Sequence, residues 1–463
     1  MLLLRQQIDV QNEQMQKMNA RIATLEKLVE RLSGSAAAAP APPTPVAVTV
    51  SEGPPLLVSA TPPATASIPS GARLHFSGFA DATGISRSTY TGAGIATAFG
   101  SIPLERAAES QLGEFRGAAN HSRFSFQLDT RLAGRDLTTY AEADFLAGTT
   151  SNVFAASNSH GLRMRLYWAR WGSSNWDLLA PNRVGLSPSP ADIMNTMLID
   201  PNYSVGLVWT RQGTLRYTRH WDRFHLAAAL ENAEPNILDP REVPVDVHGL
   251  ATRAVPGANL SPDLVVKLAY DAPFAHLEAA AAERTFQVYS AVLGQKDRAG
   301  GGALSLAGVI HAGPRIDLVT QNFIAAGGGR YAQGLVPDVV VRPDGRLVRV
   351  TTYSVLQGVE MKPTPRLNLY GYYGLVYGRR AAYRTPSGTY IGFGAPNGST
   401  LDNRTVNQAT VGFRQILWRT EGSGAISFAV NYSYLVRKLW EPQPAGALGR
   451  SHMVYTNVRY NLP

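Results

Sequence analysis

The feature that most constrains the fold is an alternation of period two, which begins at Arg73 and continues to the C-terminus. From Arg123 to Arg131, apolar residues and threonine alternate with arginine, serine, glutamine and aspartate. Successive side chains of a β-strand point to opposite faces, so this segment has one apolar and one charged face. The charged face is too polar for a protein core. A closed wall with lipid outside and water inside accommodates both faces.

The same alternation recurs along the chain and predicts an all-β fold, an antiparallel transmembrane β-barrel of about 16 strands. The predicted strands are 73–80, 123–131, 138–145, 162–168, 205–211, 214–220, 224–231, 263–270, 275–284, 302–311, 315–322, 352–362, 366–377, 408–417, 425–435 and 451–462. Short joins such as Gln212-Gly213 alternate with long ones such as 172–204. This arrangement is typical of the two rims of a membrane barrel.

The composition agrees with many strands and turns. The chain has 43 glycines, 30 prolines and 19 tyrosines, and only 17% of its residues are charged. No uncharged apolar run reaches about 18 residues, so a transmembrane helix is not expected. The absence of cysteine excludes disulfides, thiol nucleophiles and Cys-ligated metals.

The first 34 residues predict a different element, an α-helical coiled coil. One polar residue, Gln11, interrupts a seam whose members follow each other in steps of four and three: Leu4, Ile8, Gln11, Met15, Met18, Ile22, Leu25, Val29 and Leu32. Such a narrow stripe is buried only against partner helices, so we expect a homo-oligomer. The branched residues at one seam position favour a dimer by simple packing rules.

The chain divides into three parts. Residues 1–34 form the predicted oligomerisation helix, residues 35–70 a Pro/Ala-rich linker, and residues 71–463 the barrel. The start, Met1 to Arg5, is too short and too quickly polar for a secretory signal peptide. We therefore expect an exported form to carry a leader upstream of Met1.

The net charge of +9 does not indicate a nucleic-acid partner, because the Lys and Arg residues occur singly along the strands. An enzyme is not expected either, since the chain has no nucleophile elbow, zinc-protease helix or phosphate loop. A barrel-embedded lipid hydrolase is a less favoured alternative, suggested by His121 beside Ser122 and by His75 near Ser77. Histidines that only contact water on the barrel wall account for these pairs better. The nine histidines are scattered without metal-ligand spacing, so neither a metal nor a cofactor is expected.

The charged faces of the strands supply the candidate lumen residues. The pore-lining or solute-binding candidates are Arg123, Arg131, Arg163, Arg165, Arg216, Glu142, Asp144 and Asp129. A basic ladder facing an acidic one creates a transverse field, and its arginines attract carboxylates. Alternatively, the arginines only solvate the wall and pair with the acids.

The long segment 172–204 is stiffened by Pro181, Pro188, Pro190 and Pro201. It is a candidate constriction loop that folds into the lumen, and a stiff external cap is the alternative. The residues of interest in this constriction loop are Arg183, Asp192 and Asp200.

Several short motifs resemble those of the DcaP-type porins, and they occur in that family's order over nearly the whole chain. They are Ser122-Arg123-Phe124-Ser125-Phe126, Tyr140-Ala-Glu142-Ala-Asp144-Phe145, Leu162-Arg163, Asn182-Arg183-Val-Gly185-Leu186-Ser187-Pro188, Pro190-Ala-Asp192 and Leu215-Arg216-Tyr217-Thr218. The resemblance implies a trimeric, sixteen-stranded channel in the bacterial outer membrane with a periplasmic coiled coil.

The function implied is passive diffusion of small hydrophilic solutes, with a preference for anions such as carboxylates. Expected partners are further copies of the chain, outer-membrane lipid, the solutes and the barrel assembly machinery, which would recognise the amphipathic last strand. An alternative is a structural anchor, in which the coiled coil braces the periplasm or cell wall and the barrel only holds the membrane.

Overall fold

The computed structural model describes residues 71–147, 160–185, 203–238, 257–258, 260–290, 292–396 and 398–463, with the backbone alone at 181–185 and 257–258. The predicted coiled coil and linker, residues 1–70, lie outside this part of the chain.

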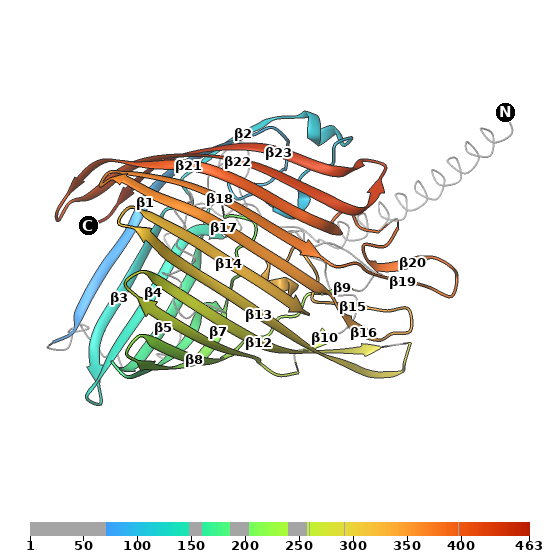
Figure 1. The fold of residues 1–463 in the computed structure, drawn as a ribbon, viewed down its shortest axis with the longest axis horizontal. Coiled ribbons are helices and arrows are strands. Elements are labelled where there is room, and N and C mark those ends of the chain that lie inside the picture. Colours follow the sequence, from blue (N-terminus) through green and yellow to red (C-terminus); the bar gives the residue numbers. More distant parts are fainter. Residues whose placement is uncertain are drawn as a thin grey trace, which may run out of the picture. The chain divides into compact units, whose positions relative to one another are not determined.

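Sixteen antiparallel strands form a closed wall, in agreement with the predicted barrel (Figure 1). They are β1 (Arg73–Arg87), β3 (Arg123–Leu132), β4 (Arg135–Ala147), β5 (Gly161–Ser173), β6 (Trp176–Gly185), β7 (Thr210–Trp221), β8 (Phe224–Glu231), β11 (Asp263–Ala272), β12 (Ala275–Ser290), β13 (Gln295–Gly313), β14 (Ile316–Ala326), β17 (Thr351–Thr364), β18 (Leu367–Gly378), β21 (Asn403–Thr420), β22 (Gly424–Gln443) and β23 (Gly446–Asn461). The wall closes at β1, which pairs with β3 on one side and with β23 on the other.

Smaller elements lie in the connections. They are β2 (Glu114–Ala118), β9 (Ile237–Leu238), β10 (Gly257–Ala258), β15 (Val339–Val341), β16 (Leu347–Arg349), β19 (Ala381–Arg384), β20 (Tyr390–Phe393) and the short 3-10 helices η1 (Phe99–Ser101), η2 (Ala108–Gln111) and η3 (Gly329–Tyr331). No helix in the described ranges is long and apolar enough to cross a membrane.

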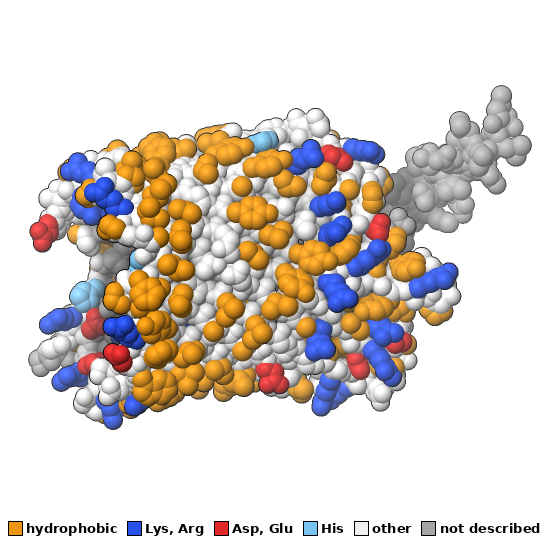
Figure 2. Space-filling view, viewed as in Figure 1, with side chains coloured by type: hydrophobic (Ala, Val, Ile, Leu, Met, Phe, Trp, Pro, Cys, Tyr) orange, Lys and Arg blue, Asp and Glu red, His pale blue; other side chains and the backbone are white. Residues whose placement is uncertain are grey.

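The two faces of the wall follow the alternation of the sequence. In β11, Leu264 and Val266 are each 42% exposed on the outside, whereas Val265 and Lys267 are 4% and 2% exposed on the inside. Figure 2 shows hydrophobic side chains spread over the wall, with Lys and Arg gathered towards its two ends. An apolar outer surface of this extent suits a hydrocarbon environment.

The two rims differ in the length of their connections. At the short-turn rim, turns of two or three residues join the strands, including 133–134, 174–175, 222–223 and 273–274. Ala133 and Gly134 have φ values of 52° and 74°, the left-handed conformation that lets a two-residue turn follow the twist of its strands. The opposite, long-loop rim carries the connections that enter the lumen.

Two predictions about the strands near residue 200 were wrong. Residues 176–185 were predicted to lie in a loop, but they form β6. The prediction failed because a proline such as Pro181 is normally excluded from a central strand. Residues 205–209 are not a strand, and Gln212-Gly213 is not a turn, since β7 continues from Thr210 through both. The apolar residues before β7 are buried because they pack inside the barrel. Their apolar character therefore did not indicate a strand of the wall.

A β-bulge reverses the faces of β5 after Arg165. Glu142 on β4 pairs with Leu166, and the next residue, Ala143, pairs with Met164, so Arg165 is the extra residue. As a result Tyr167 is exposed on the outer face, and Trp168 lies on the inner face, where it stacks on Tyr140 (5.3 Å between ring centroids). Simple alternation placed these two aromatic residues on the opposite faces.

The apolar core of the molecule lies inside the barrel rather than between layers. Its inserted members include Phe99 from the connection after β1, Val205 and Val208 from the segment before β7, and Tyr331 and Val336 from the connection after β14. Three chain segments therefore fill part of the lumen from the long-loop rim.

Candidate functional site

Residues 203–209, directly before β7, cross the lumen to the far wall. The Val205 N–H donates to Gln408 Oε1 on β21 at 2.9 Å, and the Val208 N–H donates to Gln321 Oε1 on β14 at 3.0 Å. Gln321 Nε2 also donates to the Val208 carbonyl at 3.2 Å. The contacted strands, β14 and β21, lie on either side of β17 in the wall, and five strands separate β17 from β7. This segment therefore narrows the lumen at this level.

Glycines on both sides allow the close approach of this segment to the wall. Gly206 has φ +97°, and a Cβ added there would lie 2.1 Å from the Val355 carbonyl oxygen. A Cβ added at Gly374 on β18 would lie 1.6 Å from the Val205 carbonyl oxygen. Only glycine fits at these two positions.

The substitution Gly374→Ala should move the segment away from β18 and further into the lumen, which lowers single-channel conductance. Overpacking of this kind also costs about 1–3 kcal/mol. Conductance in planar bilayers and thermal unfolding measure the two effects. Gly371→Ala on the same strand is the matched control, because its nearest neighbours are 3.8 Å away. Equal conductance of both variants and the wild type would contradict a constriction at 203–209.

The connection between β14 and β17 is held inside the barrel by buried ion pairs. Arg284 on β12 contacts Asp263 through Nε and Asp338 through Nη1, each at 2.9 Å. Arg284 Nη1 also donates to the Gly327 carbonyl at 2.9 Å, and Tyr331 donates its hydroxyl proton to Asp263 Oδ2 at 3.0 Å. Arg284 and both carboxylates are almost fully buried. Because Asp338 and Tyr331 belong to the connection, these contacts fasten it to the wall.

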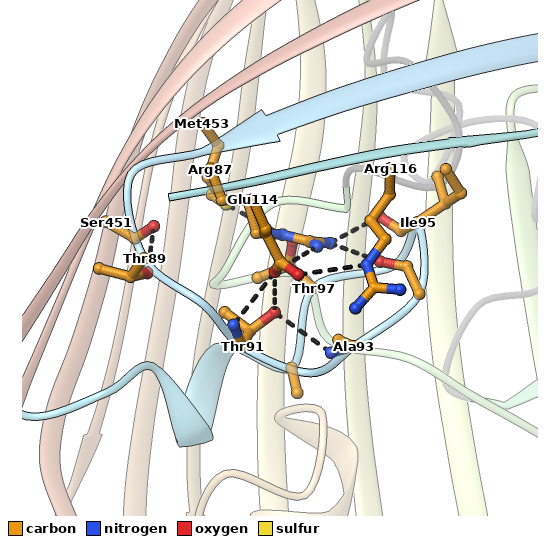
Figure 3. Close-up of polar contacts among 12 residues, drawn as sticks. Arg87, Thr89, Thr91, Ala93, Ile95, Thr97, Glu114, Arg116, Ser451 and Met453 are labelled. Carbon is orange, nitrogen blue, oxygen red and sulfur yellow. Dashed lines mark hydrogen bonds and ion pairs between the residues drawn. The ribbon is translucent and has the colours of Figure 1, made fainter. Parts of the chain in front are cut away.

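The connection between β1 and β2 is fastened by a second polar cluster (Figure 3). Arg87, at the end of β1, contacts Glu114 Oε1 at 3.0 Å and donates through Nη2 to the carbonyls of Gly94 and Ile95 at 2.7 and 3.0 Å. Glu114 also accepts the hydroxyl proton of Thr91 at 2.7 Å. The loop is thus gathered around one buried guanidinium.

A cavity of about 560 Å³ remains between the three inserted segments. Residues from all of them line it, including Phe99, Tyr203, Trp209, Arg211, Arg330 and Asn403. Arg330 contacts Glu234 at 3.2 Å. The site thus combines aromatic surfaces with two guanidinium groups.

The two cations of this cavity, Arg211 and Arg330, were not among the candidates predicted from the sequence, and Arg211 lies on the wall. The Arg211 side chain stacks on an aromatic ring. Its guanidinium lies 5.2 Å from the Trp209 ring centroid, and among the described residues its buried Nη1 has no hydrogen-bond acceptor. It also lies within electrostatic range of Arg163 and Arg165. The wrong boundary of the strand at 205–211 hid this position. The signal available in the sequence was an arginine two residues after a tryptophan in an otherwise apolar segment.

Five of the predicted lumen residues lie together on β3, β4 and β5. Arg163 contacts Asp144 at 2.6 Å, and Arg165 contacts both Glu142 at 2.7 Å and Asp144 at 2.8 Å. Arg123 lies 3.6 Å from Glu142. The two carboxylates on β4 stand between the arginines of its two neighbours, and these residues do not form opposed ladders across the lumen. This arrangement is the pairing that sequence analysis held as the alternative.

The other candidates are dispersed. Arg131 forms an exposed pair with Asp136 at the short-turn rim (3.4 Å), Asp129 accepts hydrogen bonds from Gln127 and Thr138, and Arg216 is buried on β7. Arg183 belongs to β6 and not to a loop. Asp192 and Asp200 lie outside the described residues.

Asp402 is a buried carboxyl group that neighbours the cavity-lining residues along the chain. It lies between two cavity-lining residues, Leu401 and Asn403, and accepts the Gly394 N–H at 2.9 Å. Burial raises the pKa of Asp402 to about 6, although the Gly394 hydrogen bond opposes this shift. The carboxyl group therefore gains its proton in mild acid.

The described ranges contain no group of three or more His, Asp or Glu side chains that could hold a metal ion. The geometry instead offers a lumen that three inserted segments narrow, with arginines along part of its wall.

Comparison with known proteins identifies the fold. No protein-family model and no curated protein matches the sequence. Among solved structures, the outer membrane channel DcaP of Acinetobacter baumannii is 15% identical with a TM-score of 0.66, covering 85% of this chain and 98% of that chain. OmpF of Salmonella typhi in complex with daunomycin is 10% identical with a TM-score of 0.47, covering 85% and 98%. The similarity to the DcaP channel shows that this chain has a porin-like fold.

Proposed function

We propose that this protein is an outer-membrane porin through which small hydrophilic solutes diffuse passively, with a preference for anions such as carboxylates. The observation that carries the proposal is the cavity in the narrowed lumen, whose lining includes the two cations Arg211 and Arg330. The similarity to the DcaP channel supports the channel function at the level of the fold.

Physical chemistry favours anions at this position. A guanidinium group binds a carboxylate through two parallel hydrogen bonds, and the apolar surroundings strengthen the attraction. Arg163 and Arg165 lie within electrostatic range of Arg211, so the local positive potential extends from the cavity to the wall of β5. Glu142 and Asp144 offset part of this charge.

We also propose a homotrimer, in which the heptads of residues 1–34 form a coiled coil in the periplasm. Outer-membrane lipid would surround the barrels, and the barrel assembly machinery would insert them. In this arrangement contacts between barrels outweigh the preference of the short helix for a dimer.

Single-channel recording of the purified, refolded protein under a salt gradient tests the function. We expect stepwise conductance with a reversal potential biased towards the anion. A folded barrel that conducts no ions would overturn the proposal and favour the anchor hypothesis. A cation-biased reversal potential would leave a porin but refute its anion preference.

A further inference from the structure

The fold brings together two histidines of the short-turn rim that the sequence leaves five residues apart. His220, near the end of β7, is the direct cross-strand partner of His225 on β8. The turn between these strands places both rings on the lumen side, next to Asp177 on β6 and Asp271 on β11.

The two imidazole rings face each other through their Nδ1 atoms. His220 Nδ1 lies 2.7 Å from His225 Nδ1. The other ring nitrogens contact carboxylates, His220 Nε2 to Asp177 Oδ2 at 2.9 Å and His225 Nε2 to Asp271 Oδ2 at 2.7 Å. Each ring is therefore oriented by a carboxylate.

This arrangement defines a position for a cation. An ionised carboxylate only accepts hydrogen bonds, so both Nε2 atoms carry the proton of the neutral ring. Both Nδ1 lone pairs then point at each other, which is repulsive unless a proton or a metal ion lies between them. Histidines that bind metals commonly donate their second N–H to a carboxylate in the same way.

The surroundings provide charge and room for such an ion. A cavity of about 560 Å³ adjoins the pair, and its lining includes Asp136, Asp177 and Asp222 as well as the cation Arg170. Facing groups from β12 are already engaged, because His276 contacts Asp271 at 2.5 Å and Glu278 at 3.0 Å. Glu278 also pairs with Lys267 on β11.

We propose that His220 and His225 form a reversible binding site for a divalent transition-metal ion of the Zn²⁺ or Cu²⁺ class at the short-turn mouth of the barrel. The chain contributes two imidazole ligands, and water from the adjoining cavity completes the coordination. Tetrahedral Zn–N bonds require the two Nδ1 atoms to separate from 2.7 Å to about 3.3 Å, which a small rotation of each ring supplies. With only two protein ligands, the ion exchanges with solution.

Titration of the untagged full chain in detergent micelles with Zn²⁺ tests the site at about pH 7.5, where free imidazole is mostly neutral. Calorimetry should give one bound Zn²⁺ per chain. His220→Gln and His225→Gln should each abolish this binding, and Asp177→Asn should weaken it by about 10–100-fold. Heat-modifiable mobility in gels confirms that each variant is folded.

His452→Gln is the matched control, because His452 lies on β23 and contacts Tyr432 at 2.7 Å, away from the pair. Its Zn²⁺ affinity should equal that of the wild type. Absence of Zn²⁺ binding to the wild type would mean that the pair holds a proton only and would overturn the proposal. Binding that survives both His220→Gln and His225→Gln would also overturn it, because the ion would then lie elsewhere.

Discussion

Replacing Arg123, Arg163 and Arg165 together by glutamine should reverse the proposed anion preference and make the channel prefer cations. The substitutions remove three positive charges and leave Glu142 and Asp144 on β4 without their arginine partners. The reversal potential under a salt gradient should then change sign. Because Asp144 is fully buried, loss of its partners also destabilises the wall by about 3–5 kcal/mol.

The companion variant adds Asp144→Asn to the triple substitution, which removes the unpaired buried charge and restores stability. Arg131→Gln is the matched control, since Arg131 is 78% exposed at the short-turn rim. It should leave the reversal potential unchanged. A triple variant that folds, judged by heat-modifiable mobility, and keeps the wild-type selectivity would show that these arginines do not govern ion passage.

Replacing Arg284 by methionine should release the connection between β14 and β17 from the lumen and raise single-channel conductance. The substitution keeps an unbranched apolar side chain but removes the guanidinium group, which leaves Asp263 and Asp338 buried without a cation. That arrangement costs about 3–5 kcal/mol, and movement of Asp338 into water relieves it. Bilayer recording should show larger and noisier openings, and proteases should cleave residues 327–350 faster.

Arg342→Gln is the control within the same connection, because Arg342 forms a half-exposed ion pair with Asp344 at 3.3 Å and otherwise contacts the Tyr383 ring. It should behave as the wild type. Wild-type conductance and protease resistance in folded Arg284→Met would indicate that apolar packing of Tyr331 and Val336 holds the loop without the ion pairs.

Strand alternation was sufficient to predict the barrel and its apolar outer surface, and the strand number agreed because the false strand at 205–211 took the place of the missed β6. The reason is local, because each strand of a barrel wall has one environment on each face, and this environment repeats every second residue. The prediction failed where that regularity stops. Pro181 concealed β6, and the bulge at Arg165 exchanged the faces of Tyr167 and Trp168.

The candidate site was predictable only in part. The charged faces of β3, β4 and β5 identified Arg123, Arg163 and Arg165 with their acids, because these residues follow the alternation. Arg211 and the loop contacts of Arg284 depend on segments that meet across the lumen. The Gly374 contact with Val205 joins residues far apart in the sequence and has no local signal beyond the glycine itself.

The sequence by itself determined that the wall is a closed sheet with an apolar outside and a charged inside, because apolar and charged residues alternate between neighbouring positions of each strand. Only the tertiary structure decided which loops occupy the lumen, which arginines are neutralised there and that His220 meets His225. These outcomes depend on closure of the barrel, which brings distant strands within contact distance, and on buried charges that are stable only when paired.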